Sequence, residues 1–593
     1  MLSEPYIDDE NNCSILIMTQ EKINELVDIA YSNILQIAVD GTGDKVTNIS
    51  KKRWRHFMKT LITNAKIYSM DKVNSNYGSM IIENDRIVEL GEYRDLKNNI
   101  TKEDIIWDFK GMALIPGMTD SHIHFLDYSL SLNEVSLRGV KSLEVCGELV
   151  REKAKQLQPG EWITGGGWDK NLWDGEFPNK EILDRVAPNN PVYLIGKDCH
   201  TSWVNSIALE KSGIDGNTFI DGGEIKRLDG IPTGILKENA QSLVKNIIPY
   251  PNEEIIIKAL EKGIKTAHSF GLTAVHNMSL QNDRSFYLFF KCLKKIKKEK
   301  FLTLRFTLNP ILEVVEEIVR IGMEKELMDD FLKLGASKLF TDGSLGSQSA
   351  WLIDDYLCIP HCKGMPVEYG QKLEDSIKRS ISLGYPVAVH AIGDRANREV
   401  LNILDGLHNI TRDLRHRIEH AQFLNRNDIG RFAKLGVIAS VQPIHLLADI
   451  DLIEKYWGER GRWAYPFNSL IEKGTIMAFG SDAPVEDLNP FIGIYAAVNR
   501  QRKMANVPFY NKEKITVYNA LKAYTWGPAY AVGEESIRGT LEKGKKADFV
   551  VLDKDIFNIS PKEILDIKVE YTVVDGEKVY ASVKRHTIPH SSN

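Results

Sequence analysis

The residues of this chain best suited to chemistry begin with two histidines, His122 and His124, separated by a single residue. They end the segment LIPGMTDSHIHF (114–125), in which an apolar run and a Pro-Gly turn lead into Asp120. Because alternate side chains of a β-strand point the same way, both imidazoles can project from a strand end as two metal ligands. This motif alone leaves a second interpretation open, a buried strand with two hydrogen-bonded structural histidines.

Further residues of ligand type recur at the ends of predicted strands, namely Lys338, His390, His420 and Asp482. Neutral imidazoles and a carboxylate suit a divalent metal such as zinc, whereas a protonated lysine cannot coordinate one. Lys338 follows Ser337 in a largely apolar strand, where burial lowers the pKa of an amine. Carbon dioxide can convert such an amine into a carbamate that bridges two metals. The alternative is a lysine whose ammonium group extends to solvent from a strand end.

The elements that must position these residues lie between residues 113 and 530, where strand-like and helix-like stretches alternate. Such alternation is typical of βα units, and eight strands indicate a (β/α)8 TIM barrel, an α/β fold whose active site lies at the C-terminal strand ends. The predicted strands span residues 113–120, 271–277, 302–308, 336–341, 386–391, 416–420, 436–442 and 475–481. Residues 127–255 are too many for one crossover, so we predict an inserted subdomain there.

Short strand patterns mark both flanks of this barrel. Residues 58–112 and 531–593 contain alternating β-branched residues, with hairpin signals at Asn84-Asp85 and Asp575-Gly576. Two strand-rich segments that bracket the barrel indicate one small composite β-sandwich built from both. Residues 1–57 form an N-terminal extension that partly matches the sequence 350 positions later. A decayed repeat of a helix-strand unit and a chance similarity both remain open for this extension.

The composition is that of an ordinary globular protein. The chain has 75 basic and 81 acidic residues, so it lacks the basic footprint of a nucleic-acid binder. It has no apolar stretch of membrane-spanning length, and its acidic N-terminus is unlike a secretory signal. The six scattered cysteines fit reduced thiols. We therefore expect a cytoplasmic protein with a small-molecule substrate and no nucleic-acid or membrane partner. A homodimer is the default expectation for its oligomeric state.

Six motifs occur in a fixed order along the chain: LIPGMTDSHIH, KLFTDGSLGSQSAWL, VAVHAIGDRAN, RIEHAQ, SVQPIH and GSDAPV. Together with the bracketing β-segments they resemble the amidohydrolase superfamily, specifically the YtcJ-like amidohydrolase family 3. The resemblance runs from about residue 61 to about residue 580. It implies a metal-dependent hydrolase that acts on C–N bonds of amides, N-substituted formamides, cyclic amides or ureas.

The resemblance also implies roles for the ligand-type residues. His122 and His124 would bind the more buried of two divalent metals, for which zinc is the expected element. His390 and His420 would bind the more exposed one, and a carboxylated Lys338 would bridge the two. Asp482 would be both a ligand and the catalytic base that accepts a proton from the attacking water. One metal per chain remains the alternative if Lys338 is not carboxylated.

Five further residues are candidates for contact with the substrate: Trp168, His200, Glu238, Asp342 and His445. Rigid packing is the alternative for Trp168, and Asp342 can instead orient a loop. Two other functions stay open at this point. One is a catalytically reduced regulatory or binding protein on the same fold, since some members of the family are named as regulators of exoenzyme production. The other is an ester or lactone hydrolase that uses the same metals.

Overall fold

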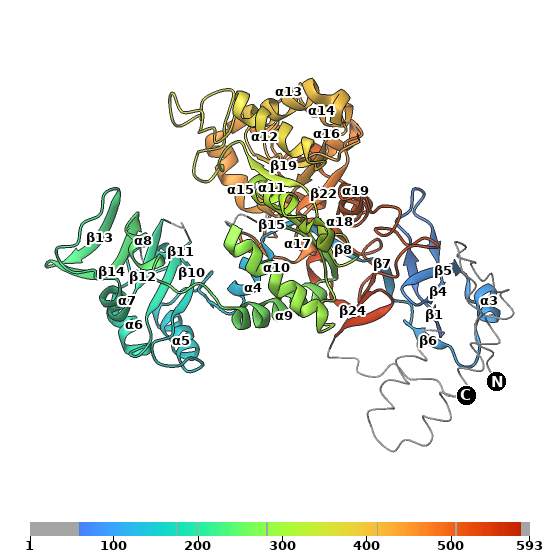
Figure 1. The fold of residues 1–593 in the computed structure, drawn as a ribbon, viewed down its shortest axis with the longest axis horizontal. Helices are drawn as coiled ribbons and strands as arrows, with labels where there is room; N and C mark the ends of the chain where they lie inside the picture. Colours follow the sequence, from blue (N-terminus) through green and yellow to red (C-terminus); the bar gives the residue numbers. More distant parts are fainter. Residues whose placement is uncertain are drawn as a thin grey trace, which may run out of the picture.

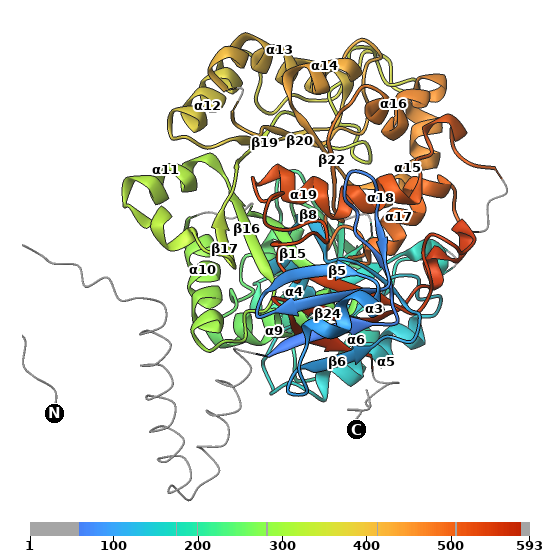
Figure 2. The ribbon, with the colours of Figure 1, turned by 90° about the vertical axis from the view of Figure 1, so that its right-hand side faces the viewer.

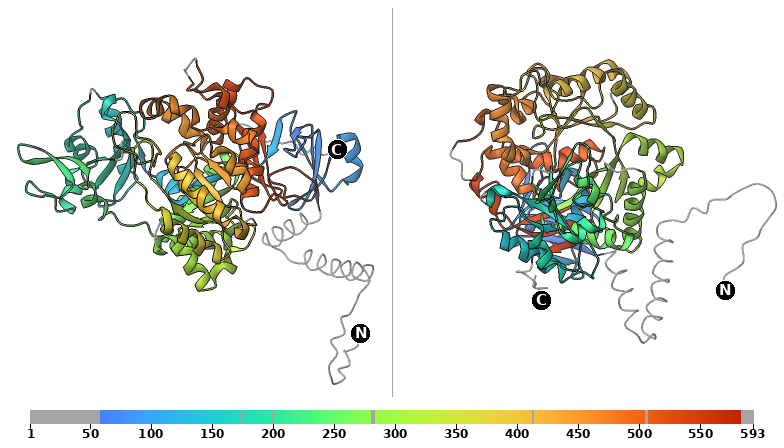
Figure 3. Two further views of the ribbon diagram at one scale, coloured as in Figure 1. Left: turned by 90° about the horizontal axis from the view of Figure 1, so that it is seen from above. Right: turned by 90° about the vertical axis from the view of Figure 1, so that its left-hand side faces the viewer.

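The computed structural model describes residues 58–582 except 174, 198–199, 280–282, 412 and 504–506. The N-terminal extension, residues 1–57, lies outside the described residues. A barrel stands in the middle of the described chain, with the inserted subdomain on one side and a β-sandwich on the other (Figure 1). Figure 3 shows the same order of the three parts when the molecule is viewed from above.

The barrel consists of two arcs of parallel strands. The first arc contains β8 (Met118–Ile123), β15 (Leu272–Ser279), β16 (Arg305–Pro310) and the short β17 (Leu332–Leu334). The second contains β18 (Ser337–Phe340), β19 (Val387–Ala391), β20 (Arg417–His420), β21 (Ile438–Val441) and β22 (Met477–Phe479). A parallel bridge between Ile311 and Lys338 joins the arcs. The predicted (β/α)8 barrel is confirmed.

Helices cover the outside of the barrel, so its strands are buried on both faces and read as apolar runs. Figure 2 shows the helices of the second arc arranged around strands β19, β20 and β22. The barrel helices between successive strands are α4 (Phe125–Ser131), α9 (Glu253–Ser269), α10 (Asp283–Lys298), α11 (Leu312–Arg320), α12 (Gly370–Ser382), α13 (Asp394–Thr411), α14 (Ile429–Leu435), α15 (Pro443–Tyr456) and α16 (Phe467–Glu472). After β22 follow α17 (Pro490–Asn499), α18 (Val517–Tyr524) and α19 (Trp526–Ala531).

The first predicted barrel strand, residues 113–120, is wrong in its bounds. Ala113–Pro116 form β7, which belongs to the sandwich, and the barrel strand β8 begins only at Met118. Gly117 separates them at a place where a Cβ atom would come within 2.4 Å of Thr273 Oγ1. Both strands are buried, so a single apolar run covers both and hides the break between them.

Two sheets form the sandwich, in the strand orders β5-β4-β1-β6 and β25-β24-β23-β7-β2-β3. Their strands are β1 (Lys59–Thr63), β2 (Lys66–Tyr68), β3 (Asn76–Tyr77), β4 (Ser79–Glu83), β5 (Arg86–Gly91), β6 (Ile105–Asp108), β7, β23 (Phe549–Leu552), β24 (Val569–Val574) and β25 (Glu577–Ala581). β7 pairs with β23, and Phe109, Leu114, Phe549 and Tyr571 share one buried core. The composite sandwich is therefore confirmed.

The inserted subdomain is built on one six-stranded sheet in the order β13-β14-β12-β11-β10-β9. The strands are β9 (Val135–Ser136), β10 (Ile163–Trp168), β11 (Val192–Gly196), β12 (Thr201–Val204), β13 (Gly223–Leu228) and β14 (Ile231–Glu238). The helices are α5 (Leu143–Ala154), α6 (Lys180–Val186), α7 (Ser206–Lys211) and α8 (Gln241–Lys245). Figure 1 shows this sheet and its helices beside the barrel, away from the sandwich.

Candidate metal centre

Five of the six predicted ligands lie at or directly after the C-terminal ends of barrel strands, and Lys338 is the second residue of the four-residue β18. Parallel strands of a barrel end on the same side, so residues far apart in sequence meet there. Their positions are His122 in β8, His124 directly after β8, Lys338 in β18, His390 in β19, His420 at the end of β20, and Asp482 after β22.

Ligand atoms of His122, His420 and Asp482 lie within 4.8 Å of one another. Within the described part of the chain, this is the cluster of three or more His, Cys, Asp or Glu side chains that could hold a metal ion. His124 Nε2 lies 3.2 Å from Asp482 Oδ1, and the rings of His390 and His420 have centroids 4.5 Å apart. The described structure thus brings the predicted imidazoles and carboxylate together.

Burial sets the protonation of these groups. It lowers the pKa of His122 to about 4 and that of His390 to about 3. Burial also lowers the pKa of His420 well below its usual value. At neutral pH these imidazoles are neutral, as metal ligands must be. Burial lowers the pKa of Lys338 to about 8, against the opposing charges of Glu419 and Asp482, so the neutral amine is accessible near physiological pH.

The carboxylate of Asp482 provides a test of whether a cation fits. Burial raises its pKa, but His122 outweighs burial and holds that pKa well below its usual range. Asp482 Oδ1 is nonetheless buried without a hydrogen-bond partner, although His122 Nε2 and His124 Nε2 lie 3.5 Å and 3.2 Å away. An unsatisfied buried carboxylate oxygen is costly. Neutral imidazoles around it form a donor set that fits a divalent cation.

The remaining nitrogens of three imidazoles are held by fixed partners. His122 Nδ1 donates to Glu419 Oε2 at 2.5 Å, and His124 Nδ1 donates to the carbonyl of Met278 at 2.8 Å. His420 Nδ1 donates to Gln442 Oε1 at 2.8 Å. Such partners fix the tautomer and the ring orientation, so that Nε2 of His122 and His124 faces Asp482.

Sequence reasoning missed Glu419, Gln442 and the neighbouring Arg417. Glu419 and Arg417 are fully buried in β20, and Arg417 Nε donates a hydrogen bond to Glu419 Oε1 at 2.5 Å. One signal was available, because the segment RIEH places opposite charges two residues apart in a strand that must be buried. Alternate residues of a strand share a face, so the two charges could have been paired with each other.

Two of the five predicted substrate residues lie at this centre. His445, near the start of α15, is buried with Nε2 at 3.4 Å from Asp482 Oδ2. Asp342 is buried and accepts hydrogen bonds from the backbone N–H groups of Trp351, Ile392 and Gly393. Asp342 therefore holds together the segments that follow β18 and β19, which corresponds to its alternative role of orienting a loop.

The other three candidates lie in the inserted subdomain. Trp168 is buried, its ring stacks on Trp173 with centroids 6.0 Å apart, and its Nε1 donates to the carbonyl of Leu194. These are the contacts of a core residue and fit the alternative of rigid packing, while contact of Trp168 with a substrate stays a prediction. His200 and Glu238 are exposed and lie 3.1 Å apart, from Nδ1 to Oε2. Their contact with a substrate stays a prediction.

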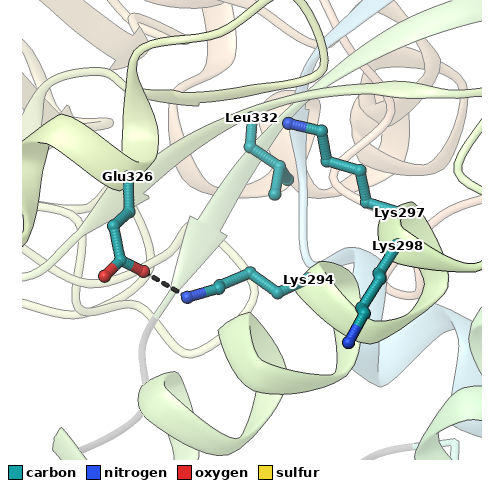
Figure 4. A pocket seen from close by; sticks show the side chains of 5 residues that line it. All are labelled: Lys294, Lys297, Lys298, Glu326 and Leu332. Carbon is teal, nitrogen blue, oxygen red and sulfur yellow. Dashed lines mark hydrogen bonds and ion pairs between the residues drawn. The ribbon is translucent and has the colours of Figure 1, made fainter.

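The lysine-rich segment of residues 291–300 lies in α10 and the turn after it. Lys294 and Lys297 form ion pairs with Glu326 and Asp329. A cavity of about 370 Å3 is lined by Lys294, Lys297, Lys298, Glu326 and Leu332. Figure 4 shows these five side chains. Because carboxylates offset these lysines, we interpret this part of α10 as a solvated helix face and not as a basic binding patch. Among the described helices, none has the length and apolar character that a membrane crossing requires.

The fold and this centre define the class of protein. The model of the amidohydrolase family matches residues 106–580, and the chain belongs to that family. A solved structure of a metal-dependent hydrolase from Pyrococcus furiosus superposes with a TM-score of 0.70 at 28% sequence identity. This similarity covers 84% of the present chain and 100% of the other.

Three relatives are similar to this chain over most of their length. Protein LONG AFTER FAR-RED 3 of Arabidopsis thaliana is 34% identical, covering 88% of this chain and 91% of the relative. YtcJ of Bacillus subtilis (strain 168) is 32% identical, covering 88% of this chain and 99% of the relative. The N-substituted formamide deformylase of Arthrobacter pascens is 27% identical, covering 87% of this chain and 97% of the relative.

Proposed function

We propose that this chain is a metal-dependent hydrolase that cleaves a C–N bond in an amide, N-substituted formamide, cyclic amide or urea-like small molecule. The proposal rests on the cluster of His122, His420 and Asp482, whose ligand atoms lie close together. In this cluster Asp482 Oδ1 is buried and has no hydrogen-bond partner. Similarity to an N-substituted formamide deformylase supports the choice of bond. The sequence grounds given above support a cytoplasmic location.

The proposed holders of one or two divalent ions, with zinc as the expected element, are His122, His124, Lys338 in its carboxylated form, His390, His420 and Asp482. When bound, such an ion supplies a water whose pKa has fallen from roughly 15.7 to about 7.

The chain's own residues would orient that water and move its proton. Asp482 is ionised at neutral pH because the neighbouring histidines hold its pKa low, so its carboxylate can accept a proton. From the same position it would pass the proton to the leaving nitrogen. His445 Nε2, at 3.4 Å from Oδ2, would hold the carboxylate in orientation. The inserted subdomain would contribute His200 and Glu238 to substrate binding.

Metal content and substrate range test the proposal together. We expect full-length protein, purified without chelator, to contain one or two equivalents of a divalent metal by elemental mass spectrometry. We also expect it to hydrolyse N-substituted formamides, amides or cyclic amides, with matched esters and lactones turned over more slowly. Faster turnover of the esters would favour the ester hydrolase instead. No metal, and none regained on adding zinc or manganese, would favour the regulatory or binding protein.

A further inference from the structure

Arg417 crosses the interior of the barrel below the proposed metal ligands. Its side chain is fully buried and begins at the first residue of β20. The guanidinium donates to the carbonyl of Ser121 in β8 at 2.5 Å, to Ser440 Oγ in β21 at 2.6 Å and to His276 Nδ1 in β15 at 3.1 Å. Barrel interiors are usually filled by branched apolar side chains, so an arginine bound to both arcs requires a reason.

The same guanidinium holds Glu419. Arg417 Nε donates to Glu419 Oε1 at 2.5 Å, and Arg417 Nη2 lies 3.2 Å from Glu419 Oε2. Glu419 Oε2 in turn accepts the hydrogen bond from His122 Nδ1 at 2.5 Å. A two-point contact between guanidinium and carboxylate fixes the carboxylate's plane as well as its position. The orientation of His122 therefore depends on a chain of contacts that starts at Arg417.

We infer that Arg417 is a positioning residue for the metal centre, an inference that rests on the proposed function. By fixing Glu419, it keeps the proton of His122 on Nδ1 and directs Nε2 toward Asp482, 3.5 Å away. Arg417 acts on His122 only through Glu419, so Arg417 and Glu419 together orient this one metal ligand. Outer partners of metal-bound histidines typically change metal affinity by roughly 10- to 100-fold.

A purely structural role would make Arg417 a buried cation that only joins strands. The chain offers a matched control for that role in Arg305, the first residue of β16. Arg305 is also buried and is paired with Asp548 at 2.9 Å and with Asp575, on the side of the barrel that meets the sandwich. Its partners belong to the sandwich segment, far along the chain from every proposed ligand.

The experiment compares zinc affinity in five full-length proteins: wild type, Arg417→Met, Glu419→Gln, the double variant Arg417→Met/Glu419→Gln, and Arg305→Met. Each is stripped of metal and titrated with zinc against a chromogenic chelator, and the melting temperature of the metal-free form is recorded. We expect Arg417→Met and Glu419→Gln to weaken zinc binding by roughly 10- to 100-fold. The double variant should lose no more than Glu419→Gln alone, because both act through one contact. Arg305→Met should lower the melting temperature but keep wild-type affinity.

Wild-type affinity in Arg417→Met, or an equal loss in Arg305→Met, would overturn the inference. If Arg417→Met does not fold, Ser440→Ala removes one anchor of Arg417 and should weaken zinc binding in the same direction, and unchanged affinity there would count against the inference. Wild-type protein that binds zinc tightly but hydrolyses no C–N substrate would overturn the proposed function and leave the affinity comparison valid.

Discussion

At the scale of single residues, the metal centre is a set of imidazoles whose second nitrogen is already engaged. His122, His124 and His420 each donate from Nδ1 to a fixed oxygen, which leaves Nε2 for another partner. In a buried site, a carboxylate next to neutral imidazoles needs a positive charge to offset it. Three predictions belong to this scale.

Replacing His122 and His124 together by alanine should abolish metal binding at the more buried position. Two of the nitrogens within 3.5 Å of Asp482 Oδ1 are lost in this variant, and no nearby group replaces them. Elemental mass spectrometry of the purified variant measures the loss. His361→Ala, a change on an exposed residue, is the control and should keep its metal. Full metal retention in the double variant would remove both histidines from the ligand set.

Asp482→Asn should keep the fold and lower kcat by roughly 100- to 10,000-fold, the usual contribution of a general base. The amide can occupy the same space but cannot accept the proton from water. Steady-state kinetics on the best C–N substrate measures the effect. Asp487→Asn in the same loop, where Asp487 accepts a hydrogen bond from the Asn489 backbone, should retain activity. Near-normal turnover by Asp482→Asn would exclude it as the base.

Lys338→Ala should lower activity by at least roughly 100-fold if its carbamate bridges two metals, because a ligand is lost. Short carboxylic acids such as acetate or propionate should restore part of that activity, since their carboxylate can take the place of the carbamate. The control is Lys333→Ala, whose ammonium contacts the Val532 carbonyl and Glu534 outside the centre. If the acids raise the activity of Lys333→Ala as well, or do not raise that of Lys338→Ala, the result would argue against carboxylation of Lys338.

At the scale of elements, the ends of the barrel strands depart from regular geometry where they deliver ligands. His420 and Asp482 have φ angles of 71° and 61°, a left-handed conformation that non-glycine residues rarely adopt. Such strain persists where surrounding contacts hold it, and the backbone N–H of Asp482 donates to the carbonyl of His122 at 2.7 Å. The strand ends therefore position side chains that regular alternation would direct elsewhere.

The prediction at this scale concerns the junction between β7 and β8. Gly117→Ala should lower the free energy of unfolding by about 1–3 kcal/mol, because its Cβ would overlap Thr273 Oγ1 and Cγ2 at 2.4 Å and 2.5 Å. Thermal unfolding of the metal-loaded protein measures the change. Gly430→Ala in α14, where the Cβ has room, should instead be neutral or stabilising. Equal stability of the two variants would show that the junction relaxes without cost.

At the scale of the whole molecule, ion pairs centred on two buried cations, Arg305 and Lys546, join the barrel to the sandwich. Arg305 at the start of β16 pairs with Asp548 and Asp575, and Lys546 pairs with Asp85 and Asp330. Burial raises the pKa of Asp548, but the charge of Arg305 outweighs it, so that pKa lies below its usual value. The two parts therefore depend on charge pairing as well as on apolar packing.

Arg305→Met should lower the free energy of unfolding by about 3–5 kcal/mol at neutral pH, because it leaves a buried carboxylate unpaired. The folded-state pKa of Asp548 is depressed, so its contribution is present above the unfolded value of about 3.9 and is lost as pH falls through the folded value. The difference between wild type and variant should therefore shrink below about pH 4. Melting temperatures from pH 7 to pH 3 measure this, and a constant difference would contradict it.

Much of this protein follows from local pattern. Alternating strand and helix segments predicted the barrel, and the strand ends carried His122, Lys338, His390 and Asp482 in the order in which the barrel brings them together. Hairpin signals at Asn84-Asp85 and Asp575-Gly576 marked two real turns between paired strands. These features are readable because period, turn chemistry and strand ends are properties of neighbouring residues.

Only the tertiary structure decided the rest. The break at Gly117 lies within one apolar run, and burial of Trp168 depends on how a subdomain packs. The contact of Arg417 with Ser121 joins residues 296 positions apart, so nothing local to either one predicts it. A buried charge is stable only through such distant partners, because desolvation must be offset by contacts that the fold supplies. Sequence determined which groups reach the strand ends, and tertiary packing decided which of them are held in place to act.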